Sequence, residues 1–70
     1  MRSLNELKEG ENGRVKWILG NRNARDVLCA FHIREGDFIR VLRRVHTGMV
    51  IACGDRRFLL GDEAACCIKV

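Results

Sequence analysis

Cysteine and histidine are the residues of this 70-residue chain that could bind a metal ion or act as nucleophiles. Cys29 and His32 lie three positions apart at the end of an expected helix, where residues i and i+3 share a face. Cys53, together with Cys66 or Cys67, could complete the tetrahedral set of ligands that Zn²⁺ prefers. No Cys-x-x-Cys pair occurs, however, and a free cysteine is usually a small buried hydrophobe. We therefore interpret the cysteines as free thiols, and we expect no bound metal and no other cofactor.

The chain does not offer the side chains that catalysis requires. An active site needs a nucleophile, a base and a group that stabilises developing charge. Ser3 is the only serine, and "SLNE" at residues 3–6 predicts that its hydroxyl caps a helical turn together with Glu6. Neither of the glycine-rich phosphate-binding motifs is present. The sequence therefore predicts a protein that is not an enzyme and has no small-molecule substrate.

Arginine is the third residue type with possible chemistry, and it gathers on one expected strand. "DFIRVLRRV" at residues 37–45 alternates apolar and basic residues. In an uninterrupted strand, Phe38, Arg40, Leu42 and Arg44 share one face. An aromatic ring beside arginines can stack on a base, so a small basic nucleic-acid-binding barrel is the alternative function. Because Phe38 is the only aromatic residue of this strand, we favour a protein partner over nucleic acid.

A docking surface should keep apolar residues exposed among charges, because interface centres are apolar and their rims are polar. Phe38 and Leu42 fit that description, and Arg40 and Arg44 would flank them. We predict these four residues as partner-binding. The outer helix surface at Arg25, beside Cys29 and His32, is a second candidate. It stays open at this point whether Phe38 and Leu42 instead complete a small second core beneath a loop.

These residues need a scaffold, and short apolar runs between turn residues predict one. The expected elements are a helical turn at 4–7, a strand at 14–19, a helix at 24–31 capped by Asn23, strands at 37–45, 49–53 and 56–60, a one-turn helix within 61–67 capped by Asp62, and a last strand at 68–70. Such an order is typical of an all-β fold with short helices. We predict one domain, residues 1–70: a small SH3-like five-stranded β-barrel with one α-helix between the first two strands.

The apolar positions of these elements predict the core. Val15, Trp17 and Leu19 alternate along the first strand, and the helix carries apolar residues at the spacing of one face. The helix is expected to pack across the barrel. The residues that we expect to be buried are Val27, Leu28, Phe31, Ile33, Ile39, Val41 and Leu60.

The charge and hydropathy of the chain indicate where in the cell the protein is located. The chain carries 13 Lys and Arg against 9 Asp and Glu, for a net charge of +4, and the carboxylates are interspersed among the basic residues. The N-terminus is charged throughout and has no apolar segment of a secretory signal. The apolar runs are far shorter than a bilayer span. We expect a soluble cytoplasmic protein that does not insert into membranes and keeps its cysteines reduced.

Nearly the whole chain resembles one known family. Its opening is similar to a Leu-x-x-Leu-x-x-Gly-x-x-Gly-x-Val pattern. The segment from Phe31 to Val41 resembles the family's Leu-Gly-Leu-x-Pro-Gly segment and the strand after it. Arg43–Arg44 and the closing "DEAACCIKV" also match. The residues that carry the opening are Leu4, Leu7, Gly10, Gly13 and Val15.

The family is the ferrous-iron transport protein A (FeoA) family of stand-alone SH3-like domains. Two residues depart from its pattern. His32 replaces a glycine that is expected to take a left-handed conformation, which histidine tolerates better than most residues. Glu35 replaces a proline that stiffens the turn.

The resemblance implies a function that composition does not show. Members of this family support ferrous-iron uptake by a large membrane permease with a cytosolic GTP-binding domain, and they are thought to contact that partner. The resemblance thus implies a small cytoplasmic accessory protein that binds the cytosolic domain of the permease. A related barrel is attached to a DNA-binding domain in iron-dependent repressors, and we expect no such domain here.

Overall fold

The computed structural model describes residues 2–70, and its elements follow the order that the sequence predicts. One expected strand is divided in two, and the other boundaries shift by a few residues. The elements are η1 (Leu4–Glu6, a 3₁₀ turn), β1 (Asn12–Arg14), β2 (Trp17–Ile18), α1 (Arg22–Ala30), β3 (Phe38–Val45), β4 (Gly48–Cys53), β5 (Arg56–Gly61), α2 (Asp62–Ala65) and β6 (Ile68–Lys69).

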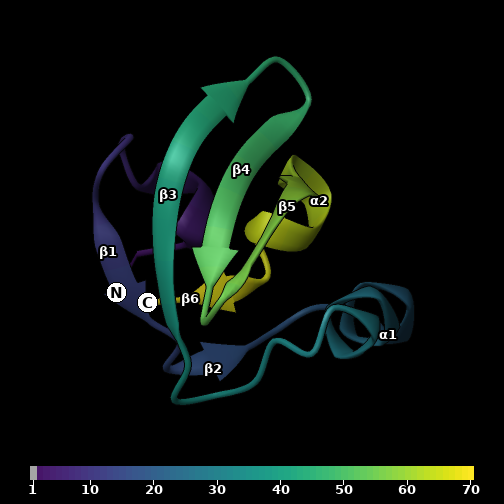
Figure 1. Ribbon diagram of the computed structural model, residues 1–70. Helices are drawn as coiled ribbons and strands as arrows, with labels where there is room; N and C mark the ends of the chain where they lie inside the picture. The colour runs from purple at the N-terminus through teal and green to yellow at the C-terminus, as the bar shows by residue number, and fades with distance from the viewer. Residues whose placement is uncertain (1) are drawn as a thin grey trace.

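The strands form two sheets rather than the closed five-stranded barrel that we expected. Four strands make one antiparallel sheet in the order β1-β3-β4-β5, and β2 pairs separately with β6 (Figure 1). The division arises where the first predicted strand changes partners. The Val15 amide donates to the Asp37 carbonyl at 2.8 Å, whereas the Lys16 amide donates to the Lys69 carbonyl at 2.7 Å. The fold is therefore mostly β with two short helices, as predicted, but the prediction of a single closed sheet is wrong.

This change of partners also alters which residues of the first segment are buried. Val15 is buried as expected. Trp17 in β2 and Leu19 directly after it are 42% and 48% exposed, because this segment pairs with β6 in the other sheet. The prediction that the three residues share one buried face is wrong.

Helix α1 begins two residues earlier than expected. The Asn21 side chain accepts a hydrogen bond from the Ala24 amide at 2.9 Å, which is the usual geometry of a helix N-cap. Asn23, the predicted cap, is instead inside the helix. Asparagine at either position satisfies the sequence signal, so the signal alone does not distinguish them.

The other two helical segments lack the caps that the sequence suggests. The Ser3 hydroxyl makes no capping bond and accepts instead from Lys69 Nζ at 2.5 Å, on the neighbouring C-terminal strand. Helix α2 begins at Asp62, so that Gly61 is the N-cap residue. The longest helix of residues 2–70 is α1, and its nine residues are too few to span a bilayer.

Helix α1 packs against α2 and lies beside the four-stranded sheet rather than across it (Figure 1). Leu28 is 1% exposed and is the only buried side chain of the helix. Val27, which we expected to be buried, is 43% exposed. Phe31 is partly buried and stacks on Phe58, with ring centroids 4.7 Å apart. A helix at the edge of the fold needs to bury only a narrow stripe, and this explains the exposure of Val27.

The core fills the space between the inner face of the four-stranded sheet and the remaining elements. Of the residues predicted to be buried, Leu28, Ile33, Ile39, Val41 and Leu60 are confirmed. The cluster also includes residues from η1, β4, α2 and β6. Its members are Leu4, Leu7, Val15, Leu28, Ile33, Ile39, Val41, Met49, Ile51, Cys53, Leu60, Ala64, Ala65 and Ile68.

The turn after α1 has the left-handed residue that the family pattern predicts. His32 has a φ of 58° and is the one non-glycine residue with a positive φ among residues 2–70. Its amide donates to the Cys29 carbonyl at 3.0 Å, and the Ile33 amide donates to the Leu28 carbonyl at 3.0 Å. These bonds end the helix and direct Ile33 into the core.

Candidate protein-interaction surface

The four-stranded sheet is strongly basic. Strands β1, β3 and β5 carry arginines, and none of the four strands carries an aspartate or glutamate; the carboxylates of the described residues lie in turns, loops and helices. The pairing of the strands divides these arginines between the two faces of the sheet. The six are Arg14, Arg40, Arg43, Arg44, Arg56 and Arg57.

Two of the six arginines turn toward the inner side of the sheet and bind backbone carbonyls. Arg44 Nη1 donates to the Asn5 carbonyl at 2.6 Å and to the Leu7 carbonyl at 2.8 Å. Arg56 Nη1 donates to the Phe31 carbonyl at 2.5 Å, at the end of α1. Both guanidinium groups therefore connect the sheet to neighbouring segments.

A β-bulge explains why Arg44 does not share a face with Arg40, as we had predicted. The β3–β4 register shifts between Val41 and Arg43. Beyond the shift, Arg44 pairs with the buried Met49. Because directly paired residues of an antiparallel ladder lie on the same face, the bulge turns Arg44 inward and Arg43 outward.

The other four arginines lie on the outer face, which we call the basic sheet face. Its first row runs across three strands as Arg40, Ala52 and Arg57, which are direct partners in the ladder. The next row is made in the same way by Arg43, Val50 and Leu59, and Phe38 with Arg14 extends the face on the other side. The basic sheet face thus comprises Arg14, Phe38, Arg40, Arg43, Val50, Ala52, Arg57 and Leu59.

Phe38 and Leu42 are 59% and 36% exposed, so they do not complete a second core. Phe38 is covered on one side by the Arg14 guanidinium, whose carbon lies 4.4 Å from the ring centroid. Leu42 lies at the bulge. The structure therefore brings Phe38 and Arg40 together, whereas it separates Arg44 and Arg25 from them.

Sequence reasoning missed three of the four arginines of this face, namely Arg14, Arg43 and Arg57. The signal for Arg57 was present. Gly54–Asp55 forms a two-residue turn, and such a turn places Arg57 opposite Ala52. Arg43 depends on the bulge, and Arg14 depends on the pairing of β1 with β3. The alternation of apolar and basic residues therefore does not predict that either arginine lies on this face.

The division of the arginines predicts different effects on stability. Replacing Arg44 with Met should lower the free energy of unfolding by about 1–2 kcal/mol, because the Asn5 and Leu7 carbonyls lose a charged donor. Arg43→Met, at the preceding residue, is the matched control, and it should change the free energy of unfolding by no more than about 0.5 kcal/mol. Urea unfolding followed by circular dichroism measures both. Equal stability of the two variants would contradict the inward position of Arg44.

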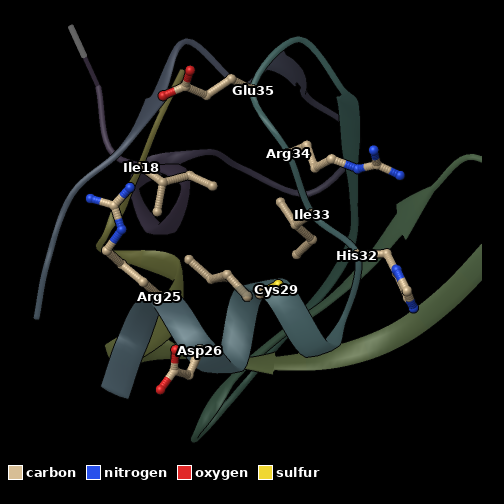
Figure 2. Close-up of a pocket in the computed structure, with 9 residues that line it drawn as sticks. Ile18, Arg25, Asp26, Cys29, His32, Ile33, Arg34 and Glu35 are labelled. Atoms are coloured by element: carbon tan, nitrogen blue, oxygen red, sulfur yellow. The ribbon is translucent and has the colours of Figure 1, made fainter. Parts of the chain in front are cut away.

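A second candidate surface is an open groove of about 770 Å³ between α1 and the segment that follows it. Figure 2 shows Ile18 and Ile33 directed into the groove, with Arg25 and Asp26 on α1 and Glu35 on the opposite rim. Arg34 also lies on the rim, so that the groove carries two basic and two acidic side chains. It is consequently less basic than the sheet face.

The candidate metal ligands do not come together. Cys29 is exposed beside the groove, Cys53 is buried in β4, and the His32 ring extends away from the groove centre (Figure 2). Within residues 2–70, no three His, Cys, Asp or Glu residues are grouped closely enough to hold a metal ion.

The paired cysteines near the C-terminus are hydrogen-bonded thiols. The sulfur atoms of Cys66 and Cys67 lie 3.1 Å and 3.4 Å from the Glu63 carbonyl, to which both thiols donate. Burial raises the pKa of the Cys67 thiol, and the neighbouring Cys66 adds to the rise. Because the thiolate is the form that binds metals, a raised pKa makes Cys67 a poorer ligand.

We expect the purified protein to contain less than one equivalent of zinc or iron, with four reactive thiols after unfolding. Elemental analysis and thiol titration of the reduced protein test this. One equivalent of either metal that disappears in Cys29→Ser would show that the thiol interpretation is wrong. Cys66→Ser provides the control, because its side chain lies apart from the Cys29 groove.

Solved structures define the class of protein to which this fold belongs. The chain is similar to the crystal structure of an iron uptake regulatory protein (FeoA), with 33% identity, a TM-score of 0.85, and coverage of 96% of this chain and 89% of that one. It also matches FeoA of Stenotrophomonas maltophilia, crystallised with zinc and described as an SH3 domain protein, with 17% identity, a TM-score of 0.83, and coverage of 99% and 88%. The fold is that of a small SH3-like β domain.

The sequence identifies the family within this class. The FeoA domain family matches residues 2–70, and the chain belongs to that family. A manganese-dependent transcriptional repressor is also similar, at 26% identity and a TM-score of 0.87, but the match covers 96% of this chain and only 39% of the repressor. A comparison with curated proteins found no match.

Proposed function

We propose that this protein is a cytoplasmic accessory factor of ferrous-iron uptake that acts by contact with the cytosolic domain of a membrane iron permease. One observation carries the proposal: the family match spans residues 2–70, and a FeoA protein described as an iron uptake regulator is 33% identical over 96% of the chain. The Stenotrophomonas relative, described as a candidate activating factor of ferrous-iron transport, supports the same role.

The surface of the protein supports a role in binding rather than in catalysis. The described residues offer an exposed basic sheet face and an open groove of mixed polarity, and the only serine is hydrogen-bonded to Lys69. The proposal therefore assigns no substrate and no reaction to this chain. Iron is the cargo of the partner.

Ferrous-iron uptake in cells tests the proposal. Deletion of the gene should lower the initial rate of radiolabelled Fe²⁺ uptake, and the wild-type chain supplied from a plasmid should restore it. The amount of permease in the membrane is measured in parallel, because loss of the permease alone would also lower uptake. Unchanged Fe²⁺ uptake in the deletion strain, at an unchanged amount of permease, would contradict the proposal.

A further inference from the structure

The basic sheet face has charges that the protein itself does not neutralise. The guanidinium groups of Arg14, Arg40, Arg43 and Arg57 form no ion pair and donate no hydrogen bond within residues 2–70; the one ion pair in that range joins Arg2 and Glu11. All four arginines are exposed. A solvated surface usually mixes charges of both signs, whereas the strands that form this face carry only positive ones.

The centre of the face is shaped to admit a small acidic group. Arg40 and Arg57 flank Ala52 on neighbouring strands, so that their backbones lie about 10 Å apart across two strand spacings. The alanine methyl group leaves the space between the two longer side chains open. A shallow hollow of about 430 Å³ adjoins this position on the Arg40 side, where Phe38, Arg40 and Ala52 line it, whereas Arg57 lies outside its lining.

The residue types on the face match those of protein interfaces. Arginine and aromatic residues are enriched in interfaces, and lysine is depleted. The face contains four arginines, one phenylalanine and no lysine. Leu59 and Val50, beside Arg43, add an apolar area in contact with the charged row, and Leu59 is 51% exposed. This combination fits a partner segment in which carboxylates are interspersed with apolar side chains.

Protein fits this face better than single-stranded nucleic acid does. Binding of single strands commonly relies on several aromatic rings on which successive bases stack. Phe38 is the one aromatic residue of the face, and the Arg14 guanidinium already covers one side of its ring at 4.4 Å.

We propose that the basic sheet face binds an acidic segment of a protein partner, with one carboxylate seated above Ala52 between Arg40 and Arg57. The inference rests on the proposed function, because it places the contact with the permease on this face. The apolar side chains of the segment pack on Leu59 and Val50, and the remaining arginines attract its other carboxylates.

Charge reversal on the face tests the inference. Surface plasmon resonance measures binding of the full chain to the purified cytosolic domain of the permease at low and high salt. Arg40→Glu combined with Arg57→Glu should weaken binding at least about tenfold, chiefly by lowering the association rate. Arg22→Glu combined with Arg25→Glu on α1 makes the same change in net charge and should bind like the wild type. Circular dichroism verifies that both variants are folded.

If the sheet-face variant and the α1 variant lost binding affinity equally, the inference would be overturned in favour of a non-local charge effect. A loss confined to the α1 variant would overturn it in favour of the groove. Unchanged binding by a folded Arg40→Glu/Arg57→Glu variant would reject the face while leaving the proposed function intact.

A second measurement keeps the inference testable if the wild type does not bind the permease domain, a result that would count against the proposed function. A synthetic glutamate-rich peptide is titrated into ¹⁵N-labelled protein, with the glutamine version as control. The inference expects amide shifts in β3, β4 and β5 around Ala52, from the glutamate peptide alone. No shifts, equal shifts from both peptides, or tighter binding of single-stranded oligouridine at the same salt would overturn it.

Discussion

Replacing Leu28 with Ala is expected to lower the free energy of unfolding by about 2–5 kcal/mol. Leu28 is 1% exposed and is the one side chain by which α1 enters the core. Truncation removes its apolar contacts and leaves a cavity, which the surrounding backbone can fill only in part. A domain of this size typically has about 3–5 kcal/mol of net stability, so the variant should be largely unfolded at physiological temperature.

Val27→Ala is the matched control for this prediction. Val27 is the neighbouring residue of the same helix but is 43% exposed. Its truncation should change stability by no more than about 0.5 kcal/mol. Thermal unfolding followed by circular dichroism compares the two variants, and equal melting temperatures would contradict the position of α1.

Gly48→Ser is expected to destabilise the protein by about 1–3 kcal/mol, because it places a side chain where only a hydrogen atom fits. A Cβ atom on Gly48 would overlap the Leu60 carbonyl oxygen and lie 2.9 Å from the Gly61 Cα. Both are backbone atoms of the neighbouring strand β5. The strand pair would therefore have to separate at the point where β5 leads into α2.

Gly61→Ser tests whether the effect is specific to that position. Gly61 is the direct ladder partner of Gly48, yet its Cβ would meet nothing closer than the Thr47 carbonyl at 4.0 Å. Serine is also a favourable N-cap residue for α2. Stability should stay within about 0.5 kcal/mol of the wild type. Urea unfolding that gives both variants the same midpoint would show that Gly48 is not sterically constrained.

The order of elements and part of the core were predictable from local sequence. Ile39 and Val41 alternate with exposed residues, as a half-buried strand requires, and both are fully buried. Gly54 has a φ of 65° in the turn that its sequence predicts. His32 takes the left-handed conformation that comparison with the family pattern suggests. The burial pattern of the strand and the turn at Gly54 depend on neighbouring residues alone.

The division of the strands into two sheets was not predictable, because it depends on pairing between residues that are distant in the sequence. Lys16 bonds to Lys69, which is 53 positions further along the chain, and this bond assigns β2 to a separate sheet. Nothing in the alternation of residues 14–19 indicates where the strand divides. The same limit applies to Trp17, whose large apolar side chain favours burial although the residue is 42% exposed.

The candidate surface was predictable only in part. Phe38 and Arg40 lie on the exposed face as expected, because they precede the bulge. Arg44 follows the bulge, which reverses the face, and its guanidinium binds the backbone of η1 and the next residue. Arg57 enters the face from another strand. To predict a surface made by several strands, one must know the register in which they pair, and the sequence of one strand does not give that register.

Photo-crosslinking in cells tests the central claim most directly, namely that this protein contacts the ferrous-iron permease through its basic sheet face. A benzoylphenylalanine replaces Phe38, which is 59% exposed on that face, or Trp17, which is 42% exposed on β2. The account predicts an adduct identified as the permease by mass spectrometry from position 38, and a much weaker one from position 17. The absence of a permease adduct from position 38, in cells that take up Fe²⁺ normally, would contradict it.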